Sequence, residues 1–142
     1  MFKSRVAALT CLSATALALG AATAHADPQT IQFQSPTGNI ACPMTGSSAL
    51  CQIADFTYTP PLKPADCHGN WGDEFSVDAG ATTQLHCHTD RPVQANAPVL
   101  AYGDQQILGN MLCRMTVDYV ECRDNQPGGH GFRLSRDSYT LS

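Results

Sequence analysis

The chain has 142 residues, of which 43% are hydrophobic and 14% are charged, and it carries seven cysteines. That length allows one domain and hardly two. Twelve acidic residues against eight basic ones make an acidic protein, and we expect no nucleic-acid partner because an acidic domain repels phosphate.

Residues 1–26 are typical of a secretory signal peptide. Lys3 and Arg5 give a positive start, an apolar stretch follows over residues 6–19, and Ala24-His25-Ala26 is a typical cleavage site. We expect a mature domain of residues 27–142 that is secreted or held in the cell envelope. No later segment reaches the roughly 18 apolar residues of a membrane span, so we expect no membrane insertion after cleavage.

Nine short apolar or alternating runs, separated by Gly, Pro, Asn and Asp, predict β-strands. No window of a dozen mature residues keeps the 3.6-residue apolar period of a helix, so we expect little helix. The pattern predicts an all-β fold, a small disulfide-stapled sandwich or barrel of short antiparallel hairpins. The expected strands are Thr30–Gln34, Asn39–Met44, Ala49–Ala54, Glu74–Asp78, Thr82–His88, Pro98–Tyr102, Met111–Thr116, Tyr119–Arg123 and Phe132–Arg136.

Six cysteines remain once Cys11 leaves with the signal, and an even number in a secreted chain predicts three disulfides. A zinc site built from thiolates would need close Cys-x2-Cys pairs, which the sequence lacks. The six are Cys42, Cys51, Cys67, Cys87, Cys113 and Cys122.

A short internal repeat links two parts of the chain. The run Gly38-Asn39-Ile40-Ala41-Cys42, followed by Cys51, returns 71 positions later as Gly109-Asn110-Met111-Leu112-Cys113, followed by Cys122. Either an ancient duplication made two related hairpins, or two hairpins stapled in the same way converged on the same residues.

The repeat also predicts a register for both hairpins. A type II′ turn at Gly46-Ser47 places Cys42 opposite Cys51 on a non-hydrogen-bonded pair, where opposite Cα atoms lie closest. The same count in the second copy pairs Cys113 with Cys122. Exclusion then leaves Cys67 to bond Cys87.

The second hairpin has a further sign of its register. Arg114 lies opposite Glu121 in that count, so opposite charges would meet across the ladder. Because Val117-Asp118 is an unusual two-residue turn, a longer second loop is an alternative.

Histidines beside two of the cysteines suggest a metal site. If Cys67 faces Cys87 on adjacent antiparallel strands, one face gathers a plausible ligand set for zinc or copper, namely Asp66, His68, His86 and His88. A hairpin that turns at Ala79-Gly80 would instead pair Cys87 with Gly72 and spread the histidines apart. We therefore expect at most weak metal binding, and no cofactor.

The glycines around His130 mark a second candidate site. They permit positive φ and close backbone approach, as an anion-binding loop requires, and Arg133 and Arg136 would supply charge. The alternative is a tight turn into the last strand, with Phe132 and Leu134 facing the core. The chain has no G-x-S-x-G elbow and no free thiol after pairing, so His130 has no evident nucleophile to activate.

Trp71 is the single tryptophan and lies in the loop-like run Gly69-Asn70-Trp71-Gly72. A loop aromatic can bind a ligand, but a large apolar ring more often fills a core position. The core interpretation is therefore the simpler one.

Three short patterns are spread along the mature chain. Residues 33–42 read F-x-S-P-T-G-N-I-x-C, residues 100–103 read L-x-Y-G, and residues 129–136 read G-H-G-F-x-L-S-R. Together they resemble a family of small secreted actinobacterial proteins of unknown function. The resemblance implies export by a mycobacterium-like organism and implies no activity. It marks Pro36 to Asn39 and His130 to Arg136 as the positions to test first.

The sequence favours a binding protein over an enzyme. A disulfide-stapled β scaffold without an evident nucleophile suggests a secreted non-catalytic module that binds a protein or cell-envelope ligand. Alternatives are a histidine-dependent metal-binding protein or enzyme, and an inhibitor of a secreted enzyme, since rigid loops suit inhibition. The candidate binding residues are Asn39, Trp71, His130, Arg133 and Arg136.

Overall fold

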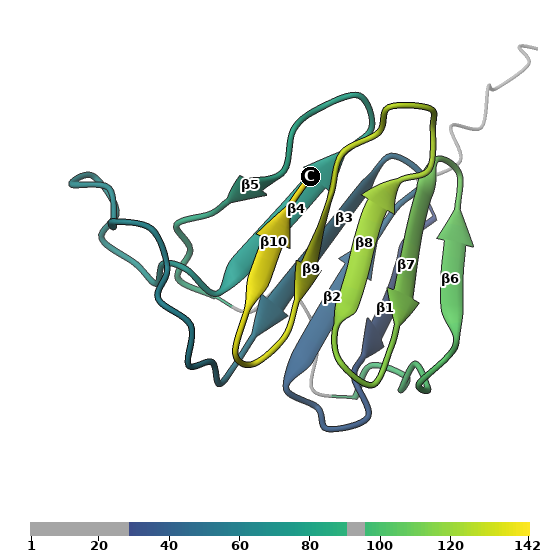
Figure 1. Ribbon diagram of the computed structural model, residues 1–142, viewed down its shortest axis with the longest axis horizontal. Helices are drawn as coiled ribbons and strands as arrows, with labels where there is room; N and C mark the ends of the chain where they lie inside the picture. Colours follow the sequence, from purple (N-terminus) through teal and green to yellow (C-terminus); the bar gives the residue numbers. More distant parts are fainter. Residues whose placement is uncertain (1–28, 91–95) are drawn as a thin grey trace, which may run out of the picture.

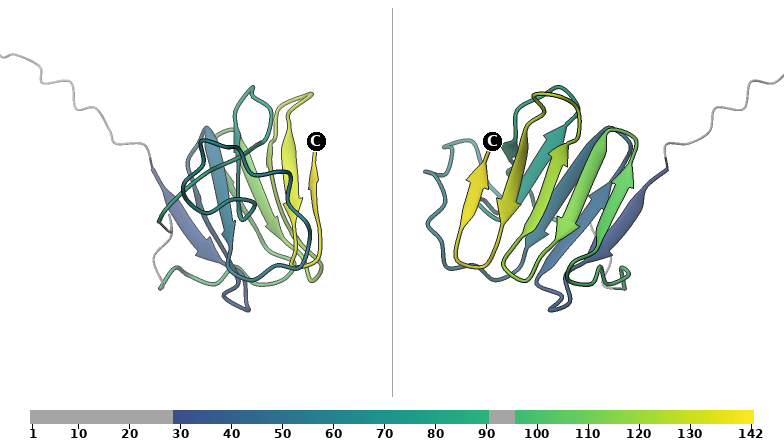
Figure 2. Two further views of the ribbon diagram at one scale, coloured as in Figure 1. Left: turned by 90° about the vertical axis from the view of Figure 1, so that its left-hand side faces the viewer. Right: turned by 45° about the vertical axis from the view of Figure 1, so that its right-hand side comes forward.

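The computed structural model describes residues 29–90 and 96–142, so the expected signal peptide and Cys11 lie outside the described residues. The strands form two five-stranded antiparallel sheets that pack face to face (Figures 1 and 2). The all-β prediction is confirmed, and the architecture is a sandwich. Within the described ranges there is no helix, and hence none long and apolar enough to cross a membrane.

Each sheet is a meander, in which strands that follow one another in sequence lie side by side. The first sheet contains β1 (Ile31–Gln34), β2 (Ile40–Met44), β3 (Ser48–Ile53), β4 (Glu74–Asp78) and β5 (Gln84–Leu85) in that order. The second sheet contains β6 (Gln105–Leu108), β7 (Met111–Met115), β8 (Val120–Asp124), β9 (Gly131–Leu134) and β10 (Tyr139–Leu141) in that order. Short turns join most of these antiparallel neighbours, whereas the long segment 54–73 joins β3 to β4.

The strand predictions need correction at four places. Residues 98–102 form no strand and contribute only a parallel bridge from Val99 to Gln34. The edge strands β6 and β10 were missed because their side chains are mostly exposed, so they lack a clear apolar alternation. The run predicted over residues 82–88 keeps only two ladder residues, since His88 forms an isolated bridge with Asn70 instead.

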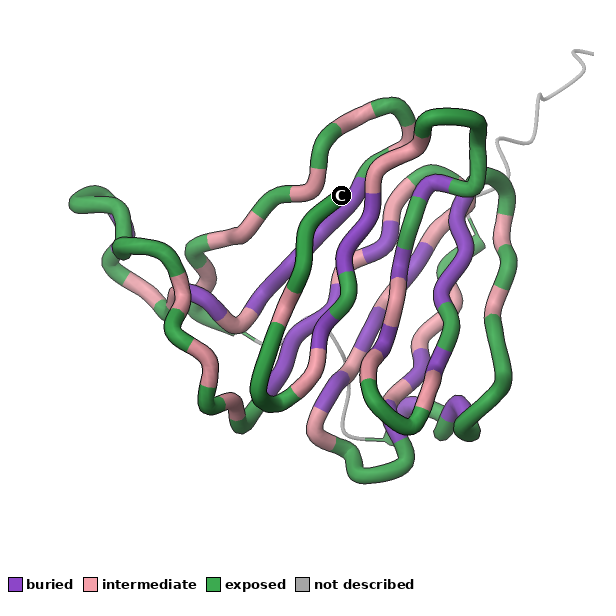
Figure 3. The backbone as a smooth tube through the Cα atoms, in the orientation of Figure 1, coloured by how far each residue is buried: buried purple, intermediate pink, exposed green. Residues whose placement is uncertain are grey.

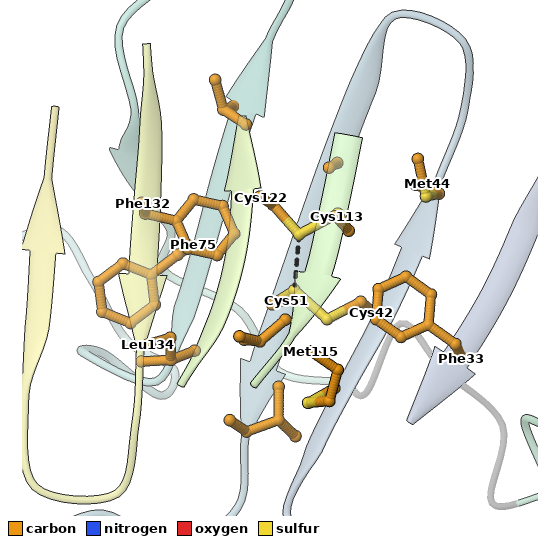
Figure 4. Packing of buried hydrophobic residues seen from close by; sticks show 14 of the residues in the cluster. Phe33, Cys42, Met44, Cys51, Phe75, Cys113, Met115, Cys122, Phe132 and Leu134 are labelled. Carbon is orange, nitrogen blue, oxygen red and sulfur yellow. Dashed lines mark hydrogen bonds between the residues drawn. A yellow bond between two sulfur atoms is a disulfide. The ribbon is translucent and has the colours of Figure 1, made fainter. Parts of the chain in front are cut away.

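The hydrophobic core lies between the inner faces of the two sheets, where the buried stretches of the strands alternate with exposed ones (Figure 3). Phe75 of β4 and Phe132 of β9 face each other across it, with ring centroids 5.9 Å apart (Figure 4). Phe132 and Leu134 are 2% and 0% exposed, so the turn-and-strand interpretation of this segment is confirmed.

The three predicted disulfides are present, and two of them stack in the core. Cys42 bonds Cys51 and Cys113 bonds Cys122, with Cα separations of 4.2 and 4.1 Å, while the third bridge joins Cys67 and Cys87. The sulfurs of Cys51 and Cys122 lie 3.6 Å apart (Figure 4). Because both sulfurs are already in disulfides, they carry no proton, and this is a van der Waals contact.

The first hairpin has the predicted register but a different turn. Thr45 N donates to Ser48 O at 2.8 Å, so the loop has two residues. Gly46 does not have a positive φ, so the predicted type II′ turn is wrong. Thr45 Oγ1 instead accepts a hydrogen bond from Ser47 N at 3.3 Å, and this side-chain contact stabilises the turn.

The second hairpin also has its predicted register, with a different ion pair. Val117-Asp118 is a two-residue loop, so the longer alternative is wrong. Arg114 lies opposite Glu121 as predicted. Glu121, however, forms its ion pair with Arg133 of the neighbouring β9, where Nε and Oε1 are 3.0 Å apart. Arg114 turns to the other side and donates to Gln105 at 3.3 Å.

The two copies of the internal repeat occupy equivalent places. They form the second and third strands of each meander. The next strand matches as well, since Phe75 pairs with Cys51 while Phe132 pairs with Cys122. Agreement in strand order and in register extends beyond the matching residues, and it favours duplication over convergence.

Candidate functional site at the lower end of the sandwich

The internal repeat relates the two ends of the sandwich to each other, but their turns pack differently. At the upper end in Figure 1, Gly46 of the β2–β3 turn packs on Gly109 of the β6–β7 turn, and Gly46 O accepts a hydrogen bond from Asn110 N at 2.8 Å. A Cβ on Gly109 would clash with Gly46 O, so this approach requires glycine. At the lower end the repeat places Val117 where Gly46 would be, and its branched side chain is 75% exposed.

This difference leaves a hollow of about 450 Å³ at the lower end, which we call the lower hollow. Its floor is made of the core residues Ile40, Met115, Val120 and Leu134. Its rim comes from the β1–β2, β7–β8 and β9–β10 turns, together with Asp55 and Tyr102. The upper end has a hollow of about 430 Å³ whose lining is mainly polar residues and glycines. An apolar floor beneath a polar rim is typical of ligand sites, so the lower hollow is the stronger candidate.

Asn39 builds the rim of the lower hollow through backbone contacts. Its Nδ2 donates to Asp55 O and its Oδ1 accepts from Asp55 N, both at 2.8 Å. Ala54 N also donates to Asn39 O, and the repeat reproduces this bond between Asn125 N and Asn110 O. The side-chain amide of Asn39 is thus engaged in holding the segment after β3 in place.

One guanidinium and three carboxylates surround the lower hollow. Arg136 is exposed, and its guanidinium has no ion pair or hydrogen bond within the described part of the chain. Ser135 Oγ donates to Asp137 at 2.7 Å, and this hydrogen bond lowers the pKa of Asp137. With Asp55 and Asp118 the rim carries more negative than positive charge at neutral pH.

Arg133 and His130, both predicted binding residues, lie away from the lower hollow. Arg133 is on the exposed face of β9, where the hydrogen bond to Glu121 raises the pKa of its guanidinium. His130 lies at the upper end, and its Nδ1 is 2.9 Å from Ser142 O. The segment from residue 129 to Arg136 therefore spans the length of β9, with its two termini at opposite ends of the sandwich.

Trp71 is outside the core, so the core interpretation is wrong. It lies partly exposed in the segment between β3 and β4, and its Nε1 donates to Pro61 O at 2.9 Å. Its ring lines another hollow of about 400 Å³, together with Gln52 and Asp73.

The structure does not gather the four predicted metal ligands. Cys67 lies outside the strands, and β4 pairs with β5 in a hairpin close to the competing register, so the required ladder is not formed. Asp66 and His68 are exposed, while His86 hydrogen bonds to Ser76. Among the described residues, the one group close enough to hold a metal consists of sulfurs that are already disulfide-bonded, in Cys42, Cys51 and Cys122.

A polar cluster around His88 was not predicted. Nε2 of His88 lies 3.0 Å from Asp73 Oδ1 and Nδ1 lies 3.7 Å from Glu74 Oε2. Burial alone would lower the pKa of His88, but the hydrogen bonds to Asp73 and to Asp90 O and the charge of Glu74 outweigh it and raise the pKa. For the Glu74 carboxyl, burial has the opposite effect and raises the pKa, because it disfavours the charged form. Glu74 lies on the outward-facing side of β4, where the strand pattern predicts exposure to solvent. Its burial could therefore not be predicted from the sequence.

Ser76 and His86 form a side-chain pair that resembles a serine–histidine dyad, since Ser76 Oγ is hydrogen bonded to His86 Nε2. Ser76 is only 7% exposed, which leaves a substrate little access to its hydroxyl. We therefore interpret the pair as a buried hydrogen bond that stabilises the outward-facing side of the first sheet.

These features define a class of protein: a pseudo-symmetric, disulfide-stapled β-sandwich with a loop-built hollow at one end. The family of unknown function DUF6636 matches residues 10–142, and the chain belongs to that family. No curated protein and no solved structure matches the chain.

Proposed function

We propose that the protein is a secreted, non-catalytic module that binds a protein or cell-envelope ligand in the lower hollow. The observation that carries this proposal is the meeting of three segments far apart in sequence around one apolar floor. They are residues 35–39, Tyr102 and residues 135–136, and each lies within one of the three patterns of the actinobacterial resemblance. A common ligand site would explain why residues from all three patterns line the same hollow.

The chemistry of the rim suits a polar ligand with some apolar surface. Tyr102 and Val117 offer exposed apolar area, at 46% and 75% exposure. Arg136 and the neighbouring carboxylates offer charged hydrogen-bonding groups. Short turns between stapled strands cost little conformational entropy on binding, which favours recognition.

Export is part of the proposal. Three disulfides are typical of an oxidising compartment, and the first 26 residues have the composition of a signal peptide. We expect N-terminal sequencing of the exported protein to begin at Asp27, and recovery of an uncleaved N-terminus from the medium would contradict this.

Position-specific photo-crosslinking tests the site. A crosslinking amino acid is placed at Val117, on the rim, or at Ile107, which is 53% exposed on the edge strand β6. The protein is then exposed to culture filtrate and cell-wall material of its producing organism. We expect adducts from position 117 and not from position 107.

Charge variants sharpen this test. Arg136→Gln is expected to lower the crosslinking yield from position 117 about tenfold, which corresponds to one lost charge-assisted contact. Arg123→Gln is the matched control, because Arg123 is exposed on β8 away from the hollow. Equal yields from positions 107 and 117, or equal effects of the two arginine variants, would contradict the proposal.

Inhibition of a secreted enzyme is the second candidate, and one observation favours it. Leu62 is 95% exposed in the proline-rich segment that projects from the side of the sandwich between β3 and β4 (Figure 1). The segment is tied down, since Trp71 Nε1 donates to Pro61 O and Lys63 Nζ donates to Gly69 O. Inhibition of a secreted protease that Leu62→Asp abolishes and Arg136→Gln preserves would establish this alternative.

A further inference from the structure

The hollow beside Trp71, which we call the Trp71 hollow, shares a wall with the lower hollow. Asp55 lines the lower hollow, while Ala54 and Phe56, its neighbours on either side, line the Trp71 hollow. Residues 54–56, which bend away from the end of β3, therefore contribute to both hollows. A ligand that crosses residues 54–56 can contact both.

The indole ring of Trp71 is held in a fixed place before any ligand arrives. Its Nε1 donates to Pro61 O at 2.9 Å. The next residue, Gly72, packs so closely on Pro60 that a Cβ would clash, and Gly72 O accepts a hydrogen bond from Tyr58 at 2.8 Å. A fixed, partly exposed aromatic ring presents a flat apolar surface at low entropic cost.

Polar side chains surround this flat ring. They offer carboxylate, amide and hydroxyl groups from Asn70, Asp73, Thr89 and Asp90. A sugar ring has the matching chemistry, because its C–H face is apolar and its hydroxyls donate to carboxylates and amides. The carboxylates, and the net negative charge of the chain, disfavour an acidic polymer.

We infer that the Trp71 hollow and the lower hollow are two subsites for one strand of a neutral glycan. Trp71 stacks on one sugar ring, and the side-chain oxygens of Asp73 and Asn70 accept hydrogen bonds from the hydroxyls of that sugar. The glycan strand then continues across residues 54–56 toward Arg136. This rests on the function proposed above, and it specifies the cell-envelope ligand as a neutral polysaccharide.

Intrinsic fluorescence reports directly on this site because Trp71 is the only tryptophan in the chain. The disulfide-bonded protein is titrated with laminarin, soluble starch, yeast mannan and arabinogalactan. We expect a saturable change in Trp71 emission with at least one of them. Asn70→Ala is expected to weaken that binding about tenfold, whereas Asp78→Asn, at the exposed end of β4, leaves it unchanged.

A second variant guards against loss through misfolding. Trp71→Phe keeps an aromatic ring and should retain the protein on a column of the responding polysaccharide, while Trp71→Ala should not, with both variants showing the wild-type pattern of disulfides. No response to any of the four polysaccharides overturns the inference. A fluorescence response to oligolysine alone also overturns it, because it would indicate a basic peptide ligand. Position-specific crosslinking at Val117 that Trp71→Ala leaves intact would overturn the inference while the proposed function stands.

Discussion

Cys51 and Cys122 meet sulfur to sulfur, 3.6 Å apart, at the centre of the sandwich. They are equivalent residues of the two repeats, and the residues opposite them on the next strands, Phe75 and Phe132, also face each other at 5.9 Å. Equivalent residues contact each other only where a twofold axis passes between them. The pseudo-twofold axis of the protein therefore runs through its stacked disulfides, as it would if two identical hairpin units had once paired through this contact.

The stacked disulfides should be energetically coupled. Replacing both members of the Cys42–Cys51 pair by alanine, or both members of the Cys113–Cys122 pair, is expected to cost about 2–5 kcal/mol of unfolding free energy. Removing both pairs should depart from additivity by about 0.5–3 kcal/mol, since each disulfide packs on the other. Urea unfolding of the single and combined variants measures this.

The Cys67–Cys87 bridge is the internal control for that cycle. It lies outside the core cluster, so its removal should add to the loss of either stacked disulfide without a coupling term. Additive behaviour of all three bridges would show that the sulfur contact carries no energy.

The upper end of the sandwich depends on Gly109. An alanine there must adopt a φ near +54° and its Cβ would meet Gly46 O, so we expect Gly109→Ala to cost more than about 2 kcal/mol. Gly103→Ala shares the positive φ but meets nothing within 4 Å, and it should cost only the backbone strain of about 1 kcal/mol. Thermal unfolding of the two variants gives the comparison, and equal shifts in Tm would contradict the close-contact argument.

The central hairpins were predictable because local rules decide them. Two cysteines placed symmetrically about a two-residue turn must face each other, and a register error of one residue would move the whole apolar set to the wrong face. Phe132 and Leu134 face the core for the same reason of alternation. The turn type was not predictable, because the packing of Gly46 on Gly109 is a tertiary contact.

The candidate sites were only partly predictable. Arg136 and Asn39 both line the lower hollow, as the sequence suggested. The side-chain amide of Asn39, however, is hydrogen bonded to the backbone of Asp55. His130 and Arg133 belong to the same sequence pattern as Arg136 and lie elsewhere, because a strand carries its two termini to opposite ends of a sandwich. The surroundings of His88 depend on how the segment after β5 packs against residues 70–74. This is a tertiary contact, so no local sequence pattern predicts it.

The amide of Asn39 should matter more than that of its repeat equivalent. Asn39→Ala removes two hydrogen bonds to Asp55 and is expected to lower the unfolding free energy by about 1–2 kcal/mol. Asn110→Ala removes one long contact, at 3.3 Å from Gln126, and should cost less than about 0.5 kcal/mol. Chemical denaturation distinguishes the two, and a reversed order would show that the Asn39 bonds form in the structure without stabilising it.

Stability should fall as the pH rises through the neutral range, because of the cluster around His88. The pKa values of His88 and Glu74 are both raised in the folded protein. A group that holds its proton more tightly when folded stabilises the fold at pH values below its unfolded pKa, and this stabilisation is lost as the pH rises through the folded value. For His88 the loss begins above the ordinary histidine pKa of about 6.5.

We therefore expect the unfolding free energy to be higher near pH 5.5 than near pH 8.5. His88→Gln removes the titrating imidazole from between Asp73 and Glu74, so it should flatten most of this difference. His68→Gln is the matched control, since His68 is exposed and should leave the slope as it is. Guanidinium unfolding at a series of pH values measures the slope. A slope that His88→Gln leaves unchanged would place the responsible proton elsewhere, and one of opposite sign would show that burial dominates over the carboxylates at His88.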